Sequence, residues 1–452
     1  MTPRLPAAVV VLALVLAALG GRFGVHMLQL ARKGAHGDFA TLYTGAHVYR
    51  EGGRFYDSQP GREGFGPTEN ADVLAGARRL GTLHAHDDFE HIHVFSYPPF
   101  TVLPFVPFTV LPFRAAAVLW QALSLGFLAL SLWCLWRAVP LSPVGGLLLV
   151  ALALLYEPLE NSLGLGQINL LILALTAVFL WALAAGRSAL AGVSLGLAVA
   201  LRVHPAIFLL YLAWRRQWAP LAWGAGTAAV CTGVAIVLVG WQETVEYATV
   251  VAPKYARAFA GLGNLSLTGW LTTVGATAAP SVSMDAWRRA GQIVSIAALA
   301  AAFWWLRPPG AREPGAGEPD ARGRGGLGGP VEAPHVNRDR PGAVPHVDHV
   351  KHIAFLTVVL YLVVPNTTIN HLVFLFIPLA VLLERAVARG ERGLVAALAV
   401  VLLLVGAVDD YYLHPSLDGG PQILFGGIKT YGLVLLALVM AAAVRPSHGA
   451  RA

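Results

Sequence analysis

Long apolar segments recur along the whole chain and are separated by shorter polar stretches. Many have the length of about 17–25 residues that a helix needs to cross a lipid bilayer. We expect helices near residues 6–30, 98–113, 115–136, 142–158, 167–186, 188–214, 219–240, 286–306, 352–364, 371–388, 393–408 and 425–444. This pattern predicts an all-α polytopic membrane protein with about 12 transmembrane helices.

The composition supports this interpretation. The chain has 452 residues, of which 56% are hydrophobic and 13% charged, whereas soluble domains have about 25% charged residues. The first apolar run has no small-residue cleavage site after a short core, so it predicts a retained span rather than a signal peptide. Cys134 and Cys231 both lie in apolar runs, which argues against a disulfide framework or a cysteine metal site.

Three polar stretches divide the apolar pattern: 31–97, 241–285 and 307–351. The third is rich in Pro, Gly and charged residues, and such a composition cannot bury a core. We therefore divide the chain into a transmembrane core, 1–306, with loops 31–97 and 241–285, a disordered linker, 307–351, and C-terminal transmembrane helices, 352–452.

The orientation follows from Lys and Arg in the short loops, which favour the cytoplasmic side. Arg215, Arg216, the segment 384–392 and Arg445 supply most of this signal. The linker and both termini are then cytoplasmic, and the loops 31–97 and 241–285 are external.

The number of spans between 98 and 214 is ambiguous, because this orientation needs an odd number of crossings. One solution makes 188–214 a single kinked span. In the other, the Pro-rich YPPFTVLPFVPFTVLPF enters the bilayer without crossing it, since each proline removes a backbone donor or kinks a helix.

Asp38 follows the first apolar run, within GDFATLYTGAHVYREGGRFYD. A carboxylate in this position can cap a helix N-terminus. It can also act as a general base toward a hydroxyl-bearing substrate. The spacing alone leaves both interpretations open.

Arg202 and His204 interrupt an apolar stretch, in LAVALRVHPAIFLLYLAWRRQW. A charge inside a membrane costs at least about 2.5–3.5 kcal/mol, so it usually faces a cavity or an anionic partner. Pro205 breaks the helix there. Phosphate is the natural ligand of such an arginine, and snorkelling to the interface is the alternative.

Other polar residues punctuate the apolar runs. Tyr97 of FSYPPF suits a membrane interface, and the amides Gln167 and Asn169 of GQINLL can satisfy a turn or bind sugar hydroxyls. Asn264 lies in GNLSLTGW, and His371 begins a late apolar run.

Four histidines and three acids occur in HAHDDFEHIH, residues 84–93. They are compatible with a metal site, but also with a polar surface patch, and we assign no metal ligand.

Taken in order, these motifs resemble those of the polyprenol-phosphate-mannose-dependent mannosyltransferases of glycosyltransferase family 87. The series is GDFATLYTGAHVYREGGRFYD, YPPF, GQIN, LRVHPAIFLLYL, NLSLTGW and PNTTINHLVF. The resemblance covers nearly the whole chain apart from 60–92 and 307–351.

The resemblance implies a GT-C fold, with 1–306 as its catalytic core and an active site in the extracytoplasmic loop region. It implies an inverting glycosyltransferase of a bacterial plasma membrane. The donor would be a polyprenyl-phosphate sugar, with mannose as the sugar, and the acceptor a glycolipid or polysaccharide. Membrane lipids are expected partners and nucleic acid is not. No cofactor is expected, and the absence of Asp-x-Asp fits a donor that needs no metal-bound diphosphate.

The resemblance also assigns roles. Asp38 would be the general base, Arg202 and His204 would neutralise the leaving phosphate, and His371 would bind substrate. We add as candidate substrate-binding residues Tyr43, Tyr97, Gln167, Asn169 and Asn264.

Two other classes of function remain open. In a transporter or lipid flippase, Asp38 and Arg202 would line a translocation path, but internal repeats with broken helices in both halves would then be expected. In a non-catalytic scaffold, neither residue would be needed.

Overall fold

The computed structural model describes residues 7–33, 37–56, 68–86, 89–307, 346–406 and 427–444. Its first elements are α1 (Ala7–Lys33), α2 (Gly37–Arg50), α3 (Ala71–Leu80), β1 (His84–His86), β2 (Phe89–His91), the 3₁₀ helix η1 (Pro99–Val110), α4 (Phe113–Ala138), α5 (Pro143–Leu155), α6 (Glu157–Gly164), α7 (Asn169–Ala184) and α8 (Ser188–Leu201).

The later elements are α9 (Ala206–Trp214), α10 (Trp218–Leu238), α11 (Trp241–Glu246), the π-helix η2 (Tyr247–Val251), α12 (Ala252–Ala256), α13 (Leu267–Ala278), α14 (Met284–Trp305), α15 (His346–Val363), the 3₁₀ helix η4 (Ile369–Leu375), α16 (Phe376–Arg389), α17 (Arg392–Gly406) and α19 (Ile428–Val444). The described part of the chain is therefore helical, apart from the antiparallel pair β1–β2.

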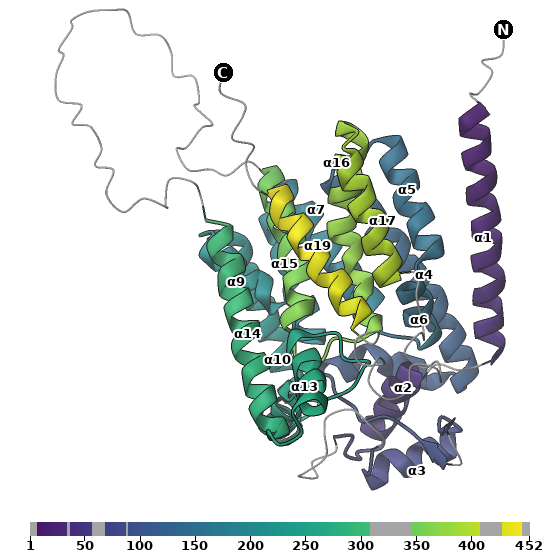
Figure 1. Cartoon of the computed structure of the whole chain (residues 1–452). Helices are drawn as coiled ribbons and strands as arrows, with labels where there is room; N and C mark the ends of the chain where they lie inside the picture. Colours follow the sequence, from purple (N-terminus) through teal and green to yellow (C-terminus); the bar gives the residue numbers. More distant parts are fainter. Residues whose placement is uncertain are drawn as a thin grey trace, which may run out of the picture.

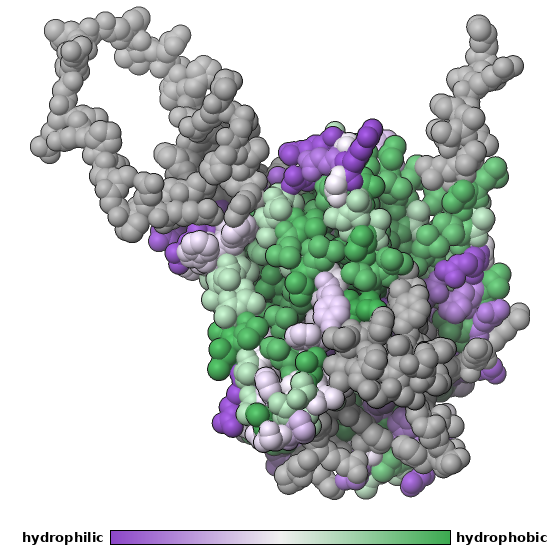
Figure 2. All heavy atoms as spheres, in the orientation of Figure 1, coloured by the Kyte–Doolittle hydropathy of each residue, from purple (hydrophilic) through white to green (hydrophobic). Residues whose placement is uncertain are grey.

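Figure 1 shows most helices side by side in one bundle, with α2 and α3 at its lower end. α1 begins and α19 ends at the upper end. The surface in Figure 2 is hydrophobic over much of its middle, whereas hydrophilic residues gather at the upper and lower margins. This distribution is expected of a bundle whose sides face lipid.

Length and hydropathy identify three candidate membrane spans among the described residues: α4, α10 and the continuous segment Ile369–Arg389. A fourth is formed if α5 and α6, which are bent by 54°, count as one span. Several other apolar helices are shorter, among them α7, α8, α17 and α19. The structure thus supports an all-α protein with apolar helices long enough for a membrane, while the number of about 12 spans stays a prediction.

The Pro-rich segment η1 remains at the lower end of the bundle. Near its start, Thr101 donates to the carbonyl of Leu201 at 2.9 Å, and near its end Thr109 accepts from Arg50 of α2 at 2.5 Å. The start of η1 therefore lies at the end of α8, and the end of η1 lies at the end of α2. The structure favours the interpretation in which this segment does not cross.

The predicted span 188–214 is two helices, because the helical hydrogen bonding stops between Leu201 and Ala206. Beyond the break, α9 runs back along α15. His204 contacts Tyr361 near the end of α15, whereas Tyr211 contacts His352 near its start. The break at 202–205 therefore lies at the tip of a helical hairpin.

Small residues allow α8 and α10 to approach closely. A Cβ atom on Gly192 or Gly196 would collide with the backbone of Pro220 or Gly224. Close backbone approach through small residues is typical of helix pairs in membranes. This contact holds α8 in place, and α8 carries Arg202 at its end.

Two predicted loop regions contain more helix than expected. The stretch 241–285 includes α11, η2, α12 and α13, and the stretch 31–97 includes α2 and α3. Of the predicted linker, 308–345 lies outside the described residues, and 346–351 is helical because it forms the start of α15.

Candidate active site

Asp38 lies in the first turn of α2 and faces the turn between α6 and α7. The backbone N–H groups of Asp38 and Phe39 both donate to the carbonyl of Leu165, at 3.0 and 3.2 Å. Gly166, at φ 66°, lets the chain reverse in the left-handed region. This reversal brings Gln167 to Asp38, and its amide nitrogen donates to Asp38 Oδ2.

Arg202 is the residue at which α8 ends, and its side chain joins three other segments. One guanidinium nitrogen donates to Asn169 Oδ1 at 3.1 Å, and the other lies 2.9 Å from His371 Nε2. The guanidinium carbon is 5.3 Å from the ring centroid of Tyr97, a cation–π arrangement. Arg202 therefore gathers residues from α7, η4 and the segment before η1.

His204 follows Arg202 by two residues and contacts a different set of side chains. Its Nε2 is 2.9 Å from the hydroxyl of Tyr361, and its ring lies 6.0 Å from that of His371 and 5.5 Å from that of Phe374. In this structure His204 thus supports the ring of His371 and contacts Tyr361.

The electrostatics of Asp38 are those of a buried carboxylate beside an arginine. Burial raises its pKa to about 6, while the charge of Arg202 and the hydrogen bond from Gln167 act in the opposite direction. Burial also raises the pKa of Tyr97, and the negative charge of Asp38 adds to this effect. Asp38, Tyr97 and Arg202 therefore form one electrostatic unit.

Three buried acceptor atoms on α6, on the turn after it and on η4 have no protein partner. They are Asn161 Oδ1, Gln167 Oε1 and Asn370 Oδ1. Asn370 is adjacent to His371, and its carbonyl accepts from Asn169 at 2.9 Å. Because a buried acceptor without a partner costs free energy, these atoms mark a place where a ligand with hydroxyl donors would be stabilised.

Two predicted site residues are engaged in packing. The hydroxyl of Tyr43 donates to the carbonyl of Leu111 at 2.7 Å, and its ring packs on Phe39 and Phe113. Asn264 is buried and donates to the carbonyls of Phe259 and Pro365, both at 2.9 Å. Neither side chain contacts Asp38 or Arg202 in this structure, and their substrate-binding roles stay predictions.

Two tyrosines of this region were not among the residues predicted from the sequence. Tyr361 contacts His204 and stacks near His371, with ring centroids 5.8 Å apart. Tyr247 lies in the π-helix η2, where burial raises its pKa to about 12 and the charge of Arg202 acts in the opposite direction. For Tyr361, the available sequence signal was a hydroxyl within the apolar run of α15. For Tyr247 there was none, because a π-helix, although frequent at functional sites, has no recognisable sequence pattern.

The histidine-rich stretch lies elsewhere. Its backbone pairs His84 with His91 across β1 and β2, and the rings of His91 and His93 lie 5.1 Å apart. Residues 87 and 88 are outside the described part. No group of three or more His, Cys, Asp or Glu suited to a metal occurs among the described residues, and a metal at this stretch stays a hypothesis.

Comparisons with known proteins show a similarity to one family. The model of glycosyltransferase family 87 matches residues 95–317. This range includes Tyr97, Gln167, Asn169 and Arg202, but not Asp38.

Curated relatives point in the same direction. The chain is 30% identical over 229 residues to a polyprenol-phosphate-mannose-dependent alpha-(1-2)-phosphatidylinositol mannoside mannosyltransferase of Mycobacterium tuberculosis, covering 47% of this chain and 52% of the relative. A phosphatidylinositol pentamannoside mannosyltransferase of the same species is 30% identical over 32% of this chain and 34% of its own length. An alpha-(1->3)-arabinofuranosyltransferase of Corynebacterium glutamicum is 34% identical over 26% of this chain and 28% of its own.

The matches thus span about half, or less, of the length of these relatives. The family match and the relatives' names agree with the motif series in the sequence, and the resemblance of this chain to glycosyltransferase family 87 is thereby confirmed.

Proposed function

We propose that this protein is an integral membrane glycosyltransferase that uses a polyprenyl-phosphate sugar, most simply mannose, as its donor. The acceptor is a hydroxyl of a glycolipid or polysaccharide at the external membrane face. The observation that carries the proposal is the convergence of Asp38 and Arg202 with amide and imidazole groups at one end of an apolar helix bundle. The names of the relatives support the choice of donor.

Asp38 is the proposed general base. A pKa near 6 leaves the carboxylate ionised at neutral pH and close to the pH at which it must accept a proton, which favours base catalysis. Gln167 holds one carboxylate oxygen. Asp38 would take the proton of the acceptor hydroxyl as its oxygen attacks the anomeric carbon, and the phosphate would leave from the opposite face, with inversion.

Arg202 and His371 are the proposed phosphate ligands. His371 Nδ1 lies 3.0 Å from the backbone N–H of Thr368, and Nε2 lies 2.9 Å from Arg202. A neutral imidazole has one proton, so it cannot accept hydrogen bonds from both donors at once. A phosphate oxygen placed between Arg202 and His371 would accept from both and remove this conflict. Negative charge develops on the leaving phosphate in the transition state, which is where such donors contribute most.

The sugar would be recognised by the acceptor atoms that lack a protein partner. Gln167 Oε1 and Asn370 Oδ1 are both buried. Sugar hydroxyls are donors of the matching kind. The prenyl chain would lie along the apolar sides of the bundle, where Figure 2 shows a largely hydrophobic surface.

The direct test is sugar transfer by membranes that contain the chain. Labelled polyprenyl-phosphate mannose and polyprenyl-phosphate arabinofuranose are supplied separately, with membranes lacking the chain as the control. We expect label from the mannose donor to enter a glycolipid or polysaccharide product. Movement of labelled donor across the bilayer without consumption would contradict transfer and support a flippase.

The sidedness of the site is tested separately by single cysteines. Glu51 follows α2, and Glu391 lies between α16 and α17. We expect an impermeant thiol reagent applied outside the cell to label Glu51→Cys and not Glu391→Cys. The reverse pattern would show that Asp38 faces the cytoplasm.

A further inference from the structure

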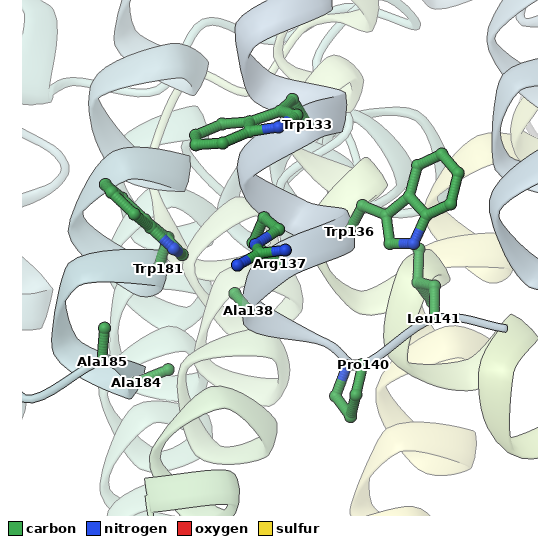
Figure 3. A pocket seen from close by; sticks show the side chains of 9 residues that line it. All are labelled: Trp133, Trp136, Arg137, Ala138, Pro140, Leu141, Trp181, Ala184 and Ala185. Carbon is green, nitrogen blue, oxygen red and sulfur yellow. The ribbon is translucent and has the colours of Figure 1, made fainter.

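A cavity lies far from Asp38, at the other end of α4. It has a volume of about 830 Å³ and is lined by the end of α4, the following turn and the end of α7. Three tryptophans border it: Trp133, Trp136 and Trp181. Figure 3 shows Arg137 between Trp181 and Trp136, beneath Trp133.

The position of this cavity relative to the membrane follows from α4. The helix begins at Phe113, which packs on Phe39 and Tyr43 of α2, and Arg137 is in its last turn. Arg137 follows Phe113 by 24 residues, which corresponds to about 36 Å of helix at 1.5 Å per residue. The hydrocarbon core of a bilayer is about 30 Å thick. The cavity therefore lies at the membrane surface opposite to the one near Asp38, provided that α4 spans the bilayer.

The charge of the cavity is positive and uncompensated. Arg137 lines it, and Arg187, just before α8, adjoins it, because its guanidinium lies 4.8 Å above the ring of the lining residue Trp181. Neither arginine has a carboxylate partner among the residues that the structure describes. Glu384 of α16 pairs with neither arginine. It accepts hydrogen bonds from the backbone N–H and the hydroxyl of Ser142, at the start of α5.

The aromatic residues of the cavity are of the interfacial kind. Trp133 is 49% and Trp136 46% exposed, and these are large apolar rings with a single donor each. Tryptophan is enriched where bilayer and water meet, and basic pockets between membrane helices on the cytoplasmic side bind lipid headgroups. The site thus combines an apolar wall for acyl chains with two cations at headgroup level.

We propose that this cavity binds the headgroup of an anionic phospholipid in the leaflet opposite to the one near Asp38. Arg137 and Arg187 bind the headgroup phosphate, and Trp133, Trp136 and Trp181 hold the glycerol and upper acyl chains. The proposal goes beyond the transfer reaction and does not depend on it, because it requires only that α4 crosses the bilayer.

The test is native mass spectrometry of the full chain after incubation with phosphatidylglycerol or phosphatidylcholine. We expect the wild type to retain phosphatidylglycerol in preference to phosphatidylcholine. The Arg137→Gln/Arg187→Gln double variant should bind phosphatidylglycerol about 30-fold more weakly, since each surface arginine contributes about fivefold toward anionic lipid. Arg187→Gln alone should weaken phosphatidylglycerol binding about fivefold. This single variant keeps the test usable if the double variant is unstable.

Arg215→Gln is the matched control. Arg215 stacks over Trp214 at 5.5 Å, and Trp214, unlike Trp181, does not line the cavity, so replacing Arg215 should leave lipid retention unchanged. Equal retention of the two lipids by the wild type would overturn the proposal. So would an equal loss in Arg215→Gln, which would indicate a general charge effect. Displacement of the lipid by millimolar inorganic phosphate would also overturn it and indicate a site for soluble anions.

Discussion

Gln167 and Asn264 are both buried amides at the lower end of the bundle, yet their polar atoms are used differently. Asn264 donates to two backbone carbonyls, and its own oxygen accepts from the backbone and hydroxyl of Ser266. Gln167 donates to the carboxylate of Asp38, and its oxygen has no protein partner. The first amide is fully satisfied, whereas the second is left with capacity for a ligand.

The difference extends to the neighbours of each amide. Around Asn264, Asn366 accepts from Phe259 and Asn264 and donates to two more carbonyls. Around Gln167, a carboxyl has a raised pKa and an imidazole lies between two donors. Polar groups that serve the fold are paired, and those at a functional site are kept partly unsatisfied at a cost in stability. The two regions, the loop-joining network around Asn264 and the cluster around Asp38, can therefore be distinguished by mutation.

The largest effect is expected for Asp38→Asn. Asparagine keeps the shape but cannot accept the proton, so turnover should fall about 10²–10⁴-fold. The variant should also be more stable at pH 7, by up to about 3 kcal/mol, because a carboxyl with its pKa raised from 3.8 to about 6 is costly to ionise in the folded state.

Transfer rates at equal protein level and thermal melting measure the two effects of Asp38→Asn. The gain in stability should shrink as the pH falls from 7 and be lost below about pH 3, where Asp38 is protonated in both the folded and the unfolded wild type. Asp72→Asn, an exposed carboxylate at the start of α3, is the control. Near wild-type transfer by Asp38→Asn would leave Asp38 as a helix cap.

Arg202→Gln should reduce the apparent affinity for the donor about 10- to 100-fold, since hydrogen bonds to a charged group contribute about 1.5–3 kcal/mol. Arg202→Lys should be milder because it keeps the charge but loses the fork that reaches both Asn169 and His371. Donor titrations of initial rates measure this. Arg79→Gln, which removes an exposed pair with Glu51, is the control. Unchanged donor affinity and turnover in Arg202→Gln would rule out the phosphate role.

The pH dependence of transfer should show the titration of Asp38. A base must be ionised, so the rate should fall as the pH is lowered through about 6 and be about tenfold lower at pH 5 than at pH 7. In Arg202→Gln the midpoint should move upward, because the charge of Arg202 lowers the pKa of Asp38. A midpoint that is the same in both proteins would show that another group limits the rate.

Asn264→Ala should have the smallest effect on catalysis and act on stability instead. It removes a donor shared by the carbonyls of Phe259 and Pro365, at a cost of about 1–3 kcal/mol. Thermal melting should show this loss, with Thr277→Ala on the exposed side of α13 as the control. A weaker donor or acceptor affinity at unchanged stability would instead show that Asn264 binds substrate.

Local patterns were sufficient to predict most of the helices. Apolar runs predicted α4, α7, α10 and α16, because a continuous apolar helix surface is a property of adjacent residues. The break at Pro205 was readable for the same reason. Helices inside polar stretches, such as α2 and α13, were not predicted, since their stability comes from packing against distant segments.

The sequence by itself determined the class of the protein, the apolar segments and a set of candidate residues that included Asp38, Arg202 and His371. Only the tertiary structure decided which of these meet, because the contacts join residues far apart in the chain: 129 positions separate Asp38 from Gln167, and 169 separate Arg202 from His371. No local pattern encodes whether an amide faces a carboxylate, as Gln167 does, or a backbone carbonyl, as Asn264 does. That choice depends on how the helices pack, and packing is a property of the whole chain.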